Sequence, residues 1–287
     1  MTHYQDHPFG SARFADPSEV RRAFRRKGGV PIGFYQGRKL YHSAQAGALL
    51  IGGAGCGKFT GQLSHIMGAP GRKKGRKYEP PRYLILDPKG EMAAVMGPGL
   101  VHQGAHVYYI NAYGLHGLPS HSVSLLSHLK STSGTLVADA RRTARTFLPE
   151  SGGGDAKFFE QKAQNWLDPL LRGLVHADGS VSPQSLFELI SMIRAVPEGW
   201  VQMAESMAAL GEPDLNVAYH EMIEMAENSR RTYDSVLSEI SNALAFMNDP
   251  ALQQTFTGDA SADFSLDVLT EDSERPVFVF LKLSVVI

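Results

Sequence analysis

Short apolar runs alternate with helical segments in the first part of the chain. The runs at 48–51, 83–86 and 106–111 are short and flanked by polar or glycine residues, so each predicts a buried strand. Helical patterns are expected between them, at about 58–67 and 91–96. Strands that alternate with helices predict a parallel sheet with crossover helices.

The pattern becomes helical from about residue 131 to residue 250. Ser182 and Pro183 are typical of a helix N-terminus, and further helices are expected at 217–225 and 235–247. Apolar residues at helical spacing are interpreted as helix core and not as a base-stacking surface: Phe158, Phe159, Ala163, Trp166, Leu167, Leu170, Leu171 and Leu174. Strand character returns at 276–281 and continues at 283–287. The fold class is therefore α/β, with a mainly α insertion.

Charge is distributed unevenly along the 287 residues. Residues 1–91 hold 16 Lys and Arg against 6 Asp and Glu, whereas residues 92–287 hold 12 against 23. The asymmetry indicates either an anionic partner for the basic part or a dipolar surface. The basic N-terminal arm is expected to be irregular, apart from a short helix over 16–24. There is no run of roughly 18 apolar residues that would predict a membrane helix, so we expect a cytoplasmic or peripheral chain.

A glycine loop lies between the first predicted strand and helix. Residues 52–58 read Gly-Gly-Ala-Gly-Cys-Gly-Lys, which fits the G-x-x-x-x-G-K pattern. Glycines allow backbone amides to turn inward onto phosphate oxygens, and Lys58 adds a full positive charge for the β- and γ-phosphates. The pattern predicts a nucleotide site with ATP as cofactor, formed by Gly52, Gly53, Ala54, Gly55, Cys56, Gly57, Lys58, Phe59, Thr60 and Asp87.

The metal part of this site departs from the usual pattern. Phe59 occupies the position where a Ser or Thr normally binds Mg²⁺, and Thr60 is turned by about 100° on a helix. Asp87 follows an apolar run and either holds Mg²⁺ through water or caps the next helix. Thr60 and Asp87 are the candidate metal ligands. No catalytic base is evident, so whether ATP is hydrolysed stays open.

A basic segment connects the first helix to the second strand. We expect it to form a loop over 70–82 with five basic side chains: Arg72, Lys73, Lys74, Arg76 and Lys77. These residues are candidates for unspecific DNA contact, which would weaken with salt. A solvated loop without a partner is the alternative interpretation.

Three stretches resemble the TraG-type coupling proteins of type IV secretion systems. The segment 10–15 is similar to the family's Gly-Ser-Ala-Arg-aromatic-Ala motif. The segment 86–91, Leu-Asp-Pro-Lys-Gly-Glu, resembles its Asp-Pro-Lys-Gly-Glu motif after the phosphate loop. The segment 238–264 resembles the end of its all-α domain.

The resemblance implies a RecA-like nucleotide-binding domain with an inserted all-α domain, assembled as a homo-hexamer at the cytoplasmic face of the inner membrane. It implies an ATP-binding motor component that brings a relaxase–DNA complex or protein effectors to other type IV secretion components. Asp87 and Glu91 would then lie near the nucleotide or at the subunit boundary. The expected regions are a basic arm at 1–40, the first part of the P-loop domain at 41–130, the insertion at 131–255 and a return to the P-loop domain at 256–287.

Two parts of the family pattern are not found in this sequence. The N-terminal membrane helices and the later Walker B strand that ends in Asp-Glu are both missing, so we expect a truncation, a frameshift or a fragment. A non-catalytic adaptor that keeps the α domain is therefore an alternative to the ATPase. A small P-loop kinase ranks last, because the α region lacks a recognisable arginine lid.

Overall fold

A computed structural model describes residues 13–24, 29–42, 48–53, 55–69, 72–74, 77–150, 153, 155–209, 213–258 and 261–282. The chain divides into two compact units, and the division passes through all three strands of its main sheet. One unit comprises Met1–Tyr83, Met92–Val107 and Ser273–Phe278. The other comprises Leu84–Glu91, Tyr108–Asp272 and Val279–Ile287. The four predicted regions and their boundaries stay predictions.

The first unit begins with helix α1 (Pro17–Ala23), as the sequence predicts. The Asp16 side chain accepts hydrogen bonds from the N–H groups of Ser18 and Glu19, and Glu19 accepts one from Asp16 N–H. The prediction that the arm is irregular up to residue 40 is wrong. Strands β1 (Val30–Tyr35) and β2 (Arg38–His42) pair there as an antiparallel hairpin. Gln36 and Gly37 turn the chain with φ values of 48° and 73°, the signs that a tight hairpin turn requires.

The predicted strand at 48–51 is wrong. The backbone there has no regular structure, and Leu49 and Ile51 are 86% and 84% exposed. A strand is stabilised by hydrogen bonds to a neighbour, and none of the described strands pairs with these residues. The helix expected at 58–67 is confirmed, although it begins as a π-helix, η1 (Phe59–Leu63), and continues as α2 (Ser64–Met67).

The main sheet contains β5 (Arg82–Leu86), β6 (His106–Ile110) and β9 (Val277–Leu281), in the order β5-β9-β6. Val277 N–H donates to Pro81 O at one end of the β5–β9 pair, and Asp87 N–H donates to Leu281 O at the other. This register shows that β5 and β9 are parallel. The bonds from His106 N–H to Pro276 O and from Lys282 N–H to Ile110 O show the same for β6.

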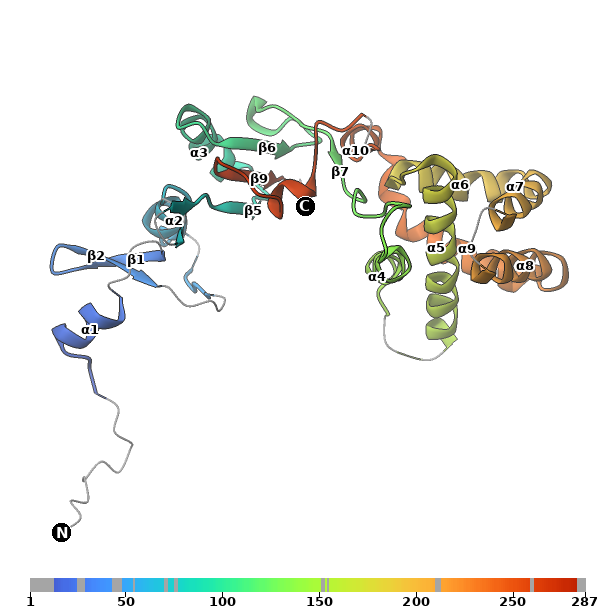
Figure 1. Cartoon of the computed structure of the whole chain (residues 1–287), viewed down its shortest axis with the longest axis horizontal. Coiled ribbons are helices and arrows are strands. Elements are labelled where there is room, and N and C mark those ends of the chain that lie inside the picture. The colour runs from blue at the N-terminus through green and yellow to red at the C-terminus, as the bar shows by residue number, and fades with distance from the viewer. Residues whose placement is uncertain are drawn as a thin grey trace, which may run out of the picture. The chain divides into compact units, whose positions relative to one another are not determined.

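The central strand β9 is buried over Val277–Phe280 because it has a neighbour on each side. Its position confirms the strand predicted at 276–281, whereas the continuation at 283–287 lies outside the described residues. Helix α3 (Glu91–His102) connects β5 to β6 and runs one and a half turns further than predicted. The parallel sheet with a crossover helix is therefore confirmed (Figure 1).

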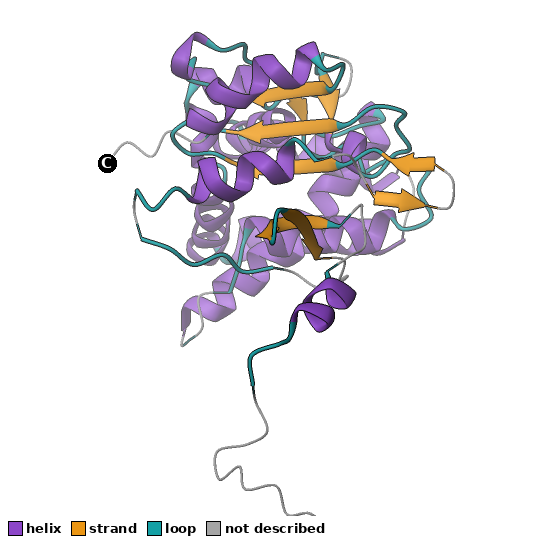
Figure 2. Cartoon of the chain, turned by 90° about the vertical axis from the view of Figure 1, so that its left-hand side faces the viewer, coloured by secondary structure: helices purple, strands orange, loops and turns teal. Residues whose placement is uncertain are grey.

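The described residues of the basic segment at 70–82 form two paired strands, which corrects the predicted loop. Strands β3 (Arg72–Lys74) and β4 (Lys77–Glu79) are antiparallel (Figure 2). Their register sets Arg72 opposite Glu79 and Lys74 opposite Lys77. Strands made of polar residues leave no apolar run in the sequence, so the pattern of apolar runs did not predict them.

Helices predominate in the second unit. They are α4 (Leu136–Phe147), α5 (Asp155–Asp178), α6 (Pro183–Ala195), α7 (Pro197–Ala209), α8 (Pro213–Asn228), α9 (Arg230–Ala243) and α10 (Pro250–Thr255). Short 3-10 helices η2 (Leu115–Gly117), η3 (Ala245–Asn248) and η4 (Leu266–Leu269) accompany them, and β7 (Val123–Ser124) pairs in parallel with β8 (Phe264–Ser265). The predicted α insertion is thus mainly α.

Helix α5 supplies the centre of the helical core and packs against α4, α6, α8 and α9 (Figure 1). Trp166, Leu170 and Leu171 are fully buried, as predicted. The prediction that Phe158 belongs to the helix core is wrong, because 55% of this residue is exposed. Phe159 packs against the core. Successive helix residues point about 100° apart, so only one of the two rings faces inward.

Candidate functional site

The glycine loop curls back on itself instead of extending. Gly55 and Gly57 have φ values of 72° and 80°, a region that residues with a side chain rarely adopt. A Cβ on Gly52 would lie 2.5 Å from the sulfur of Cys56, so the two ends of the loop approach each other closely. Cys56 N–H donates a long hydrogen bond of 3.4 Å to Gly53 O. The backbone therefore has the compact form that the glycine pattern predicts.

The side chain of Lys58 folds over this loop. Its Nζ donates to Gly52 O at 2.6 Å and to Gly53 O at 2.7 Å. The ammonium thus lies against the same loop that is predicted to hold phosphates, and phosphate oxygens could replace the two carbonyl acceptors. The loop residues other than Ala54, which lies outside the described residues, are brought together as a candidate phosphate cradle.

The two residues after the lysine have different surroundings. Phe59 is partly buried and offers no oxygen, whereas Thr60 is exposed and its Oγ1 donates to Gly57 O at 3.4 Å. The Thr60 hydroxyl is therefore close to the loop backbone. Its role as a metal ligand stays a prediction.

Polar residues follow all three strands of the main sheet at the same edge. Asp87 follows β5, Asn111 follows β6 and Lys282 follows β9, and they are 3%, 1% and 2% exposed. The carboxyl edge of a parallel sheet is where α/β proteins bind ligands. We call Asp87, Asn111 and Lys282 the strand-end cluster.

Asn111 and Lys282 converge on one carbonyl. Asn111 Nδ2 donates to Leu115 O at 3.3 Å and to Leu118 O at 3.1 Å, while its Oδ1 accepts from Leu115 N–H at 2.9 Å. Lys282 Nζ lies 3.4 Å from the same Leu115 O and 5.4 Å from the centroid of the Tyr109 ring. The cluster therefore fixes the loop that follows β6.

Asp87 begins a turn that is also held from both sides. Gly90 N–H donates to Asp87 O at 2.9 Å, and Gly90 has a φ of 70°. A ring nitrogen of His116, Nε2, lies 2.7 Å from Lys89 O.

Burial lowers the pKa of Lys282 below its ordinary value, and the negative charge of Asp87 offsets part of this shift.

The candidate DNA-binding residues lie on the β3–β4 hairpin, apart from Arg76, which lies outside the described residues. The antiparallel register sets Lys73 opposite Tyr78 and Lys74 opposite Lys77. The hairpin therefore places these basic positions within a short stretch of backbone. Contact with DNA stays a prediction.

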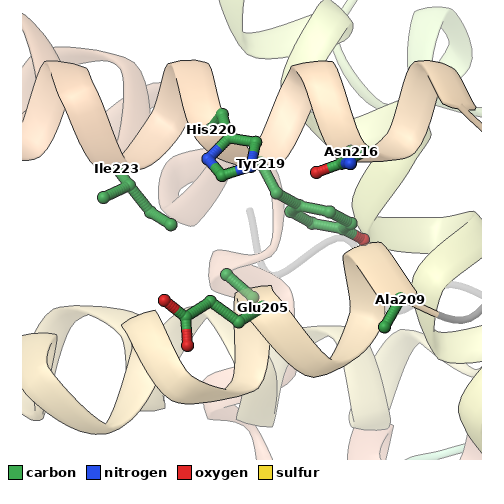
Figure 3. A pocket seen from close by; sticks show the side chains of 7 residues that line it. Glu205, Ala209, Asn216, Tyr219, His220 and Ile223 are labelled. Carbon is green, nitrogen blue, oxygen red and sulfur yellow. The ribbon is translucent and has the colours of Figure 1, made fainter.

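Two of the pockets in the helical region contain charged or polar lining residues from more than one helix. A pocket of about 190 Å³ lies between α7 and α8, where Glu205, Asn216 and His220 line it beside the buried Tyr219 (Figure 3). A second, of about 430 Å³, is lined by Arg141 and Arg145 of α4, several residues of α5 that include Arg172, and Asp214 of α8. Neither pocket was predicted from the sequence.

Arg172 is another buried charge that the sequence patterns did not reveal. It is 2% exposed, and it donates from Nε to Asp168 at 2.9 Å and from an Nη atom to Asp214 at 2.8 Å. A charged pair four residues apart inside the apolar pattern of α5 was a signal for it. A lysine directly after the apolar run of β9 was the corresponding signal for Lys282.

Within the described residues, no group of three or more His, Cys, Asp or Glu side chains is arranged to hold a metal ion. In the same part of the chain, no helix combines the length and the apolar character needed to cross a membrane.

A family described as "Type IV secretory system Conjugative DNA transfer" matches residues 17–286. No curated protein sequence matches the chain. Among solved structures, the bacterial conjugative coupling protein TrwBdeltaN70 in an unbound form is 15% identical with a TM-score of 0.51, over 92% of this chain and 52% of that one. This likeness shows the fold, and it confirms the predicted RecA-like class.

Two other TrwB structures match less closely in shape. One is the plasmid coupling protein TrwB in complex with ADP and Mg²⁺, at 14% identity and a TM-score of 0.44, over 79% of this chain and 44% of that one. The other is TrwB with an ATP analogue, at 15% identity and a TM-score of 0.46, over 79% and 45%. The chain spans about half the length of the solved structures that it matches.

Proposed function

Because the chain belongs to the type IV secretory system conjugative DNA transfer family, we propose that it is an ATP-binding component of a coupling protein. In this role it brings conjugative DNA, as a relaxase–DNA complex, or protein effectors to a secretion channel. The main support for a nucleotide site is the curled loop at 52–58, over which the Lys58 ammonium folds.

Each part of the loop has a task in this proposal. Gly55 and Gly57 let backbone amides face the phosphates, and Lys58 exchanges its two carbonyl partners for β- and γ-phosphate oxygens. A bound Mg²⁺ would neutralise phosphate charge, and the Thr60 hydroxyl, which lies 3.4 Å from Gly57 O, would be its candidate protein ligand.

Nucleotide binding by the full chain tests the site. We expect Lys58→Ala to abolish binding of a fluorescent ATP analogue measured by anisotropy, because the variant loses the only full charge in the loop sequence. Lys130→Ala, which removes an exposed lysine of the other unit, is the matched control and should bind normally. Unchanged affinity in Lys58→Ala would reject the site.

A nucleotide-binding adaptor without hydrolysis is the second candidate function. Phe59 favours it, because this residue replaces the usual hydroxyl ligand of Mg²⁺ by an apolar ring. Release of phosphate by the purified chain, stimulated by DNA and abolished in Lys58→Ala, would count against the adaptor.

The family also suggests the surroundings in which the chain works. We propose assembly as a homo-hexamer, contact with other type IV secretion components, and a place at the cytoplasmic face of the inner membrane. Sedimentation of the chain with ATP and Mg²⁺ tests the assembly, and a mass that stays that of a monomer would contradict it.

A further inference from the structure

Asp87 and Lys282 bring opposite charges to adjacent strand ends. Asp87 N–H donates to the carbonyl of Leu281, the residue directly before Lys282, at 2.9 Å. Both side chains are almost completely buried. Buried charges are paired in folded proteins because an isolated one loses its hydration without compensation. The backbone therefore places each residue where it can compensate the other.

The remaining contacts of Lys282 keep it at this position. Its ammonium faces the Tyr109 ring and the Leu115 carbonyl, which are acceptors of a positive charge. Its Cε lies 3.4 Å from the point where a Cβ on Gly90 would stand, so the side chain passes along the turn that Asp87 begins. Lys282 thus contacts the turn at its far end as well.

We propose that Lys282 is a positioning residue for the 87–90 turn and that its ammonium stands in for a metal ion as the counter-charge of Asp87. Asp87 then shapes the turn at the sheet edge and is not a Mg²⁺ ligand. This role of Asp87 rests on the proposed function, because Asp87 is a candidate residue of the nucleotide site. The pairing of Asp87 with Lys282 can be tested without nucleotide.

Two physical reasons favour the ammonium over a metal at this carboxylate. The Lys282 side chain passes along the turn that Asp87 begins, so its positive charge repels a second cation there. The nearly complete burial of Asp87 leaves little room for the water molecules that Mg²⁺ retains.

Binding of Mn²⁺ to the full, nucleotide-free chain, followed by electron paramagnetic resonance, separates the two roles of Asp87. The variants are Asp87→Asn, Lys282→Ala and the double variant. Lys89→Ala is the matched control, because it removes an exposed lysine from the same turn. Circular dichroism establishes that each variant is folded.

We expect Asp87→Asn to leave Mn²⁺ affinity unchanged. Lys282→Ala should raise it roughly tenfold, the size of effect that groups around a metal ligand typically exert, and the double variant should lack this gain. Lys89→Ala should match the unchanged chain. Weaker Mn²⁺ binding in Asp87→Asn, or no gain in a folded Lys282→Ala, would overturn the proposal.

If Lys282→Ala does not fold, the near-isosteric variant Asp87→Asn tests the pairing by itself. The ¹⁵N resonance of the Lys282 ammonium, assigned in the unchanged chain, should then shift in Asp87→Asn while Mn²⁺ affinity stays the same. An unshifted resonance would overturn the pairing. If the unchanged chain does not bind ATP, the proposed function is wrong. The Mn²⁺ and ¹⁵N measurements still test the pairing of Asp87 with Lys282, because they use no nucleotide.

Discussion

Among single residues, Arg172 is a buried charge whose substitution is expected to destabilise the chain. Arg172 is enclosed, and its two carboxylate partners differ in exposure: the Asp168 side chain is 8% exposed and that of Asp214 is 56%. Removing the arginine leaves Asp168 with the longer distance of 3.6 Å to the exposed Arg141. The pairing of Asp168 therefore depends mainly on Arg172.

We expect Arg172→Met to lower the free energy of unfolding by about 3–5 kcal/mol, measured by urea denaturation. The physical reason is that a buried carboxylate loses its counter-charge. Arg142→Met breaks an exposed pair with Asp139 and should cost no more than about 1 kcal/mol. Equal effects of the two substitutions would contradict the assignment of Arg172 as a structural charge.

The Asp214 carboxylate should make stability depend on pH. The hydrogen bond from Arg172 holds the pKa of Asp214 below its ordinary value of 3.8. A lowered folded-state pKa contributes stability that is present above 3.8 and is lost as the pH falls through the lower folded value. Asp214→Asn should therefore be less stable than the unchanged chain near neutral pH, and the gap should close below 3.8.

Thermal unfolding over a series of pH values measures this gap. In an Arg172→Met background the gap should become smaller, because the largest cause of the lowered pKa is gone while the backbone hydrogen bonds at Asp214 and Leu215 remain. A gap of unchanged size in that background would show that the hydrogen bond from Arg172 is not the main cause.

At the scale of elements, the close approach of α5 to α7 and α8 depends on one glycine. A Cβ on Gly173 would stand 2.6 Å from Met207 Cε and would also collide with the hydroxyl of Tyr219. That hydroxyl is fixed, since it donates to Pro169 O at 2.6 Å in the buried core. The space between these helices is therefore full.

Gly173→Ala should destabilise the chain by roughly 1–3 kcal/mol through overpacking, despite the higher helix propensity of alanine. Gly134→Ala is the control, because nothing lies within 4 Å of its Cβ position, and it should change the denaturation midpoint little. A Gly173→Ala protein as stable as the control would show that the helices separate without cost.

At the scale of the whole molecule, the charge distribution predicts how the chain meets DNA. Residues 1–91 hold 16 basic and 6 acidic residues, and the β3–β4 hairpin concentrates several of the basic ones. Contacts to phosphates release counterions, so affinity for DNA of any sequence should fall steeply as salt is raised.

Replacing Lys73, Lys74 and Lys77 by alanine should weaken DNA binding and reduce the slope of log affinity against log salt by about 1 for each phosphate that the variant no longer neutralises. Fluorescence anisotropy with a labelled oligonucleotide measures both quantities. Replacing Lys130, Arg194 and Arg231, which lie in the acidic part, provides a charge-matched control. A salt slope that is the same in both triple variants would exclude the hairpin as the DNA contact.

Features that depend on neighbouring residues could be predicted from the amino-acid sequence alone. The glycine loop at 52–58, the caps at Asp16 and Ser182, and the helices of the α region were all predicted, because turn chemistry, capping and helical period act over a few positions. The loop retains its compact form even though the preceding strand was predicted wrongly.

Which distant residues meet depended on how the segments pack in space. The end of β9 lies next to Asp87 because β9 is the neighbour of β5 in the sheet, and Arg172 pairs with Asp214 because α8 packs on α5. The exposure of Leu49 and Ile51 was likewise invisible in their apolar pattern, since burial of a strand requires a neighbouring strand. Contacts between distant segments follow the path of the chain in space, and no local pattern encodes that path.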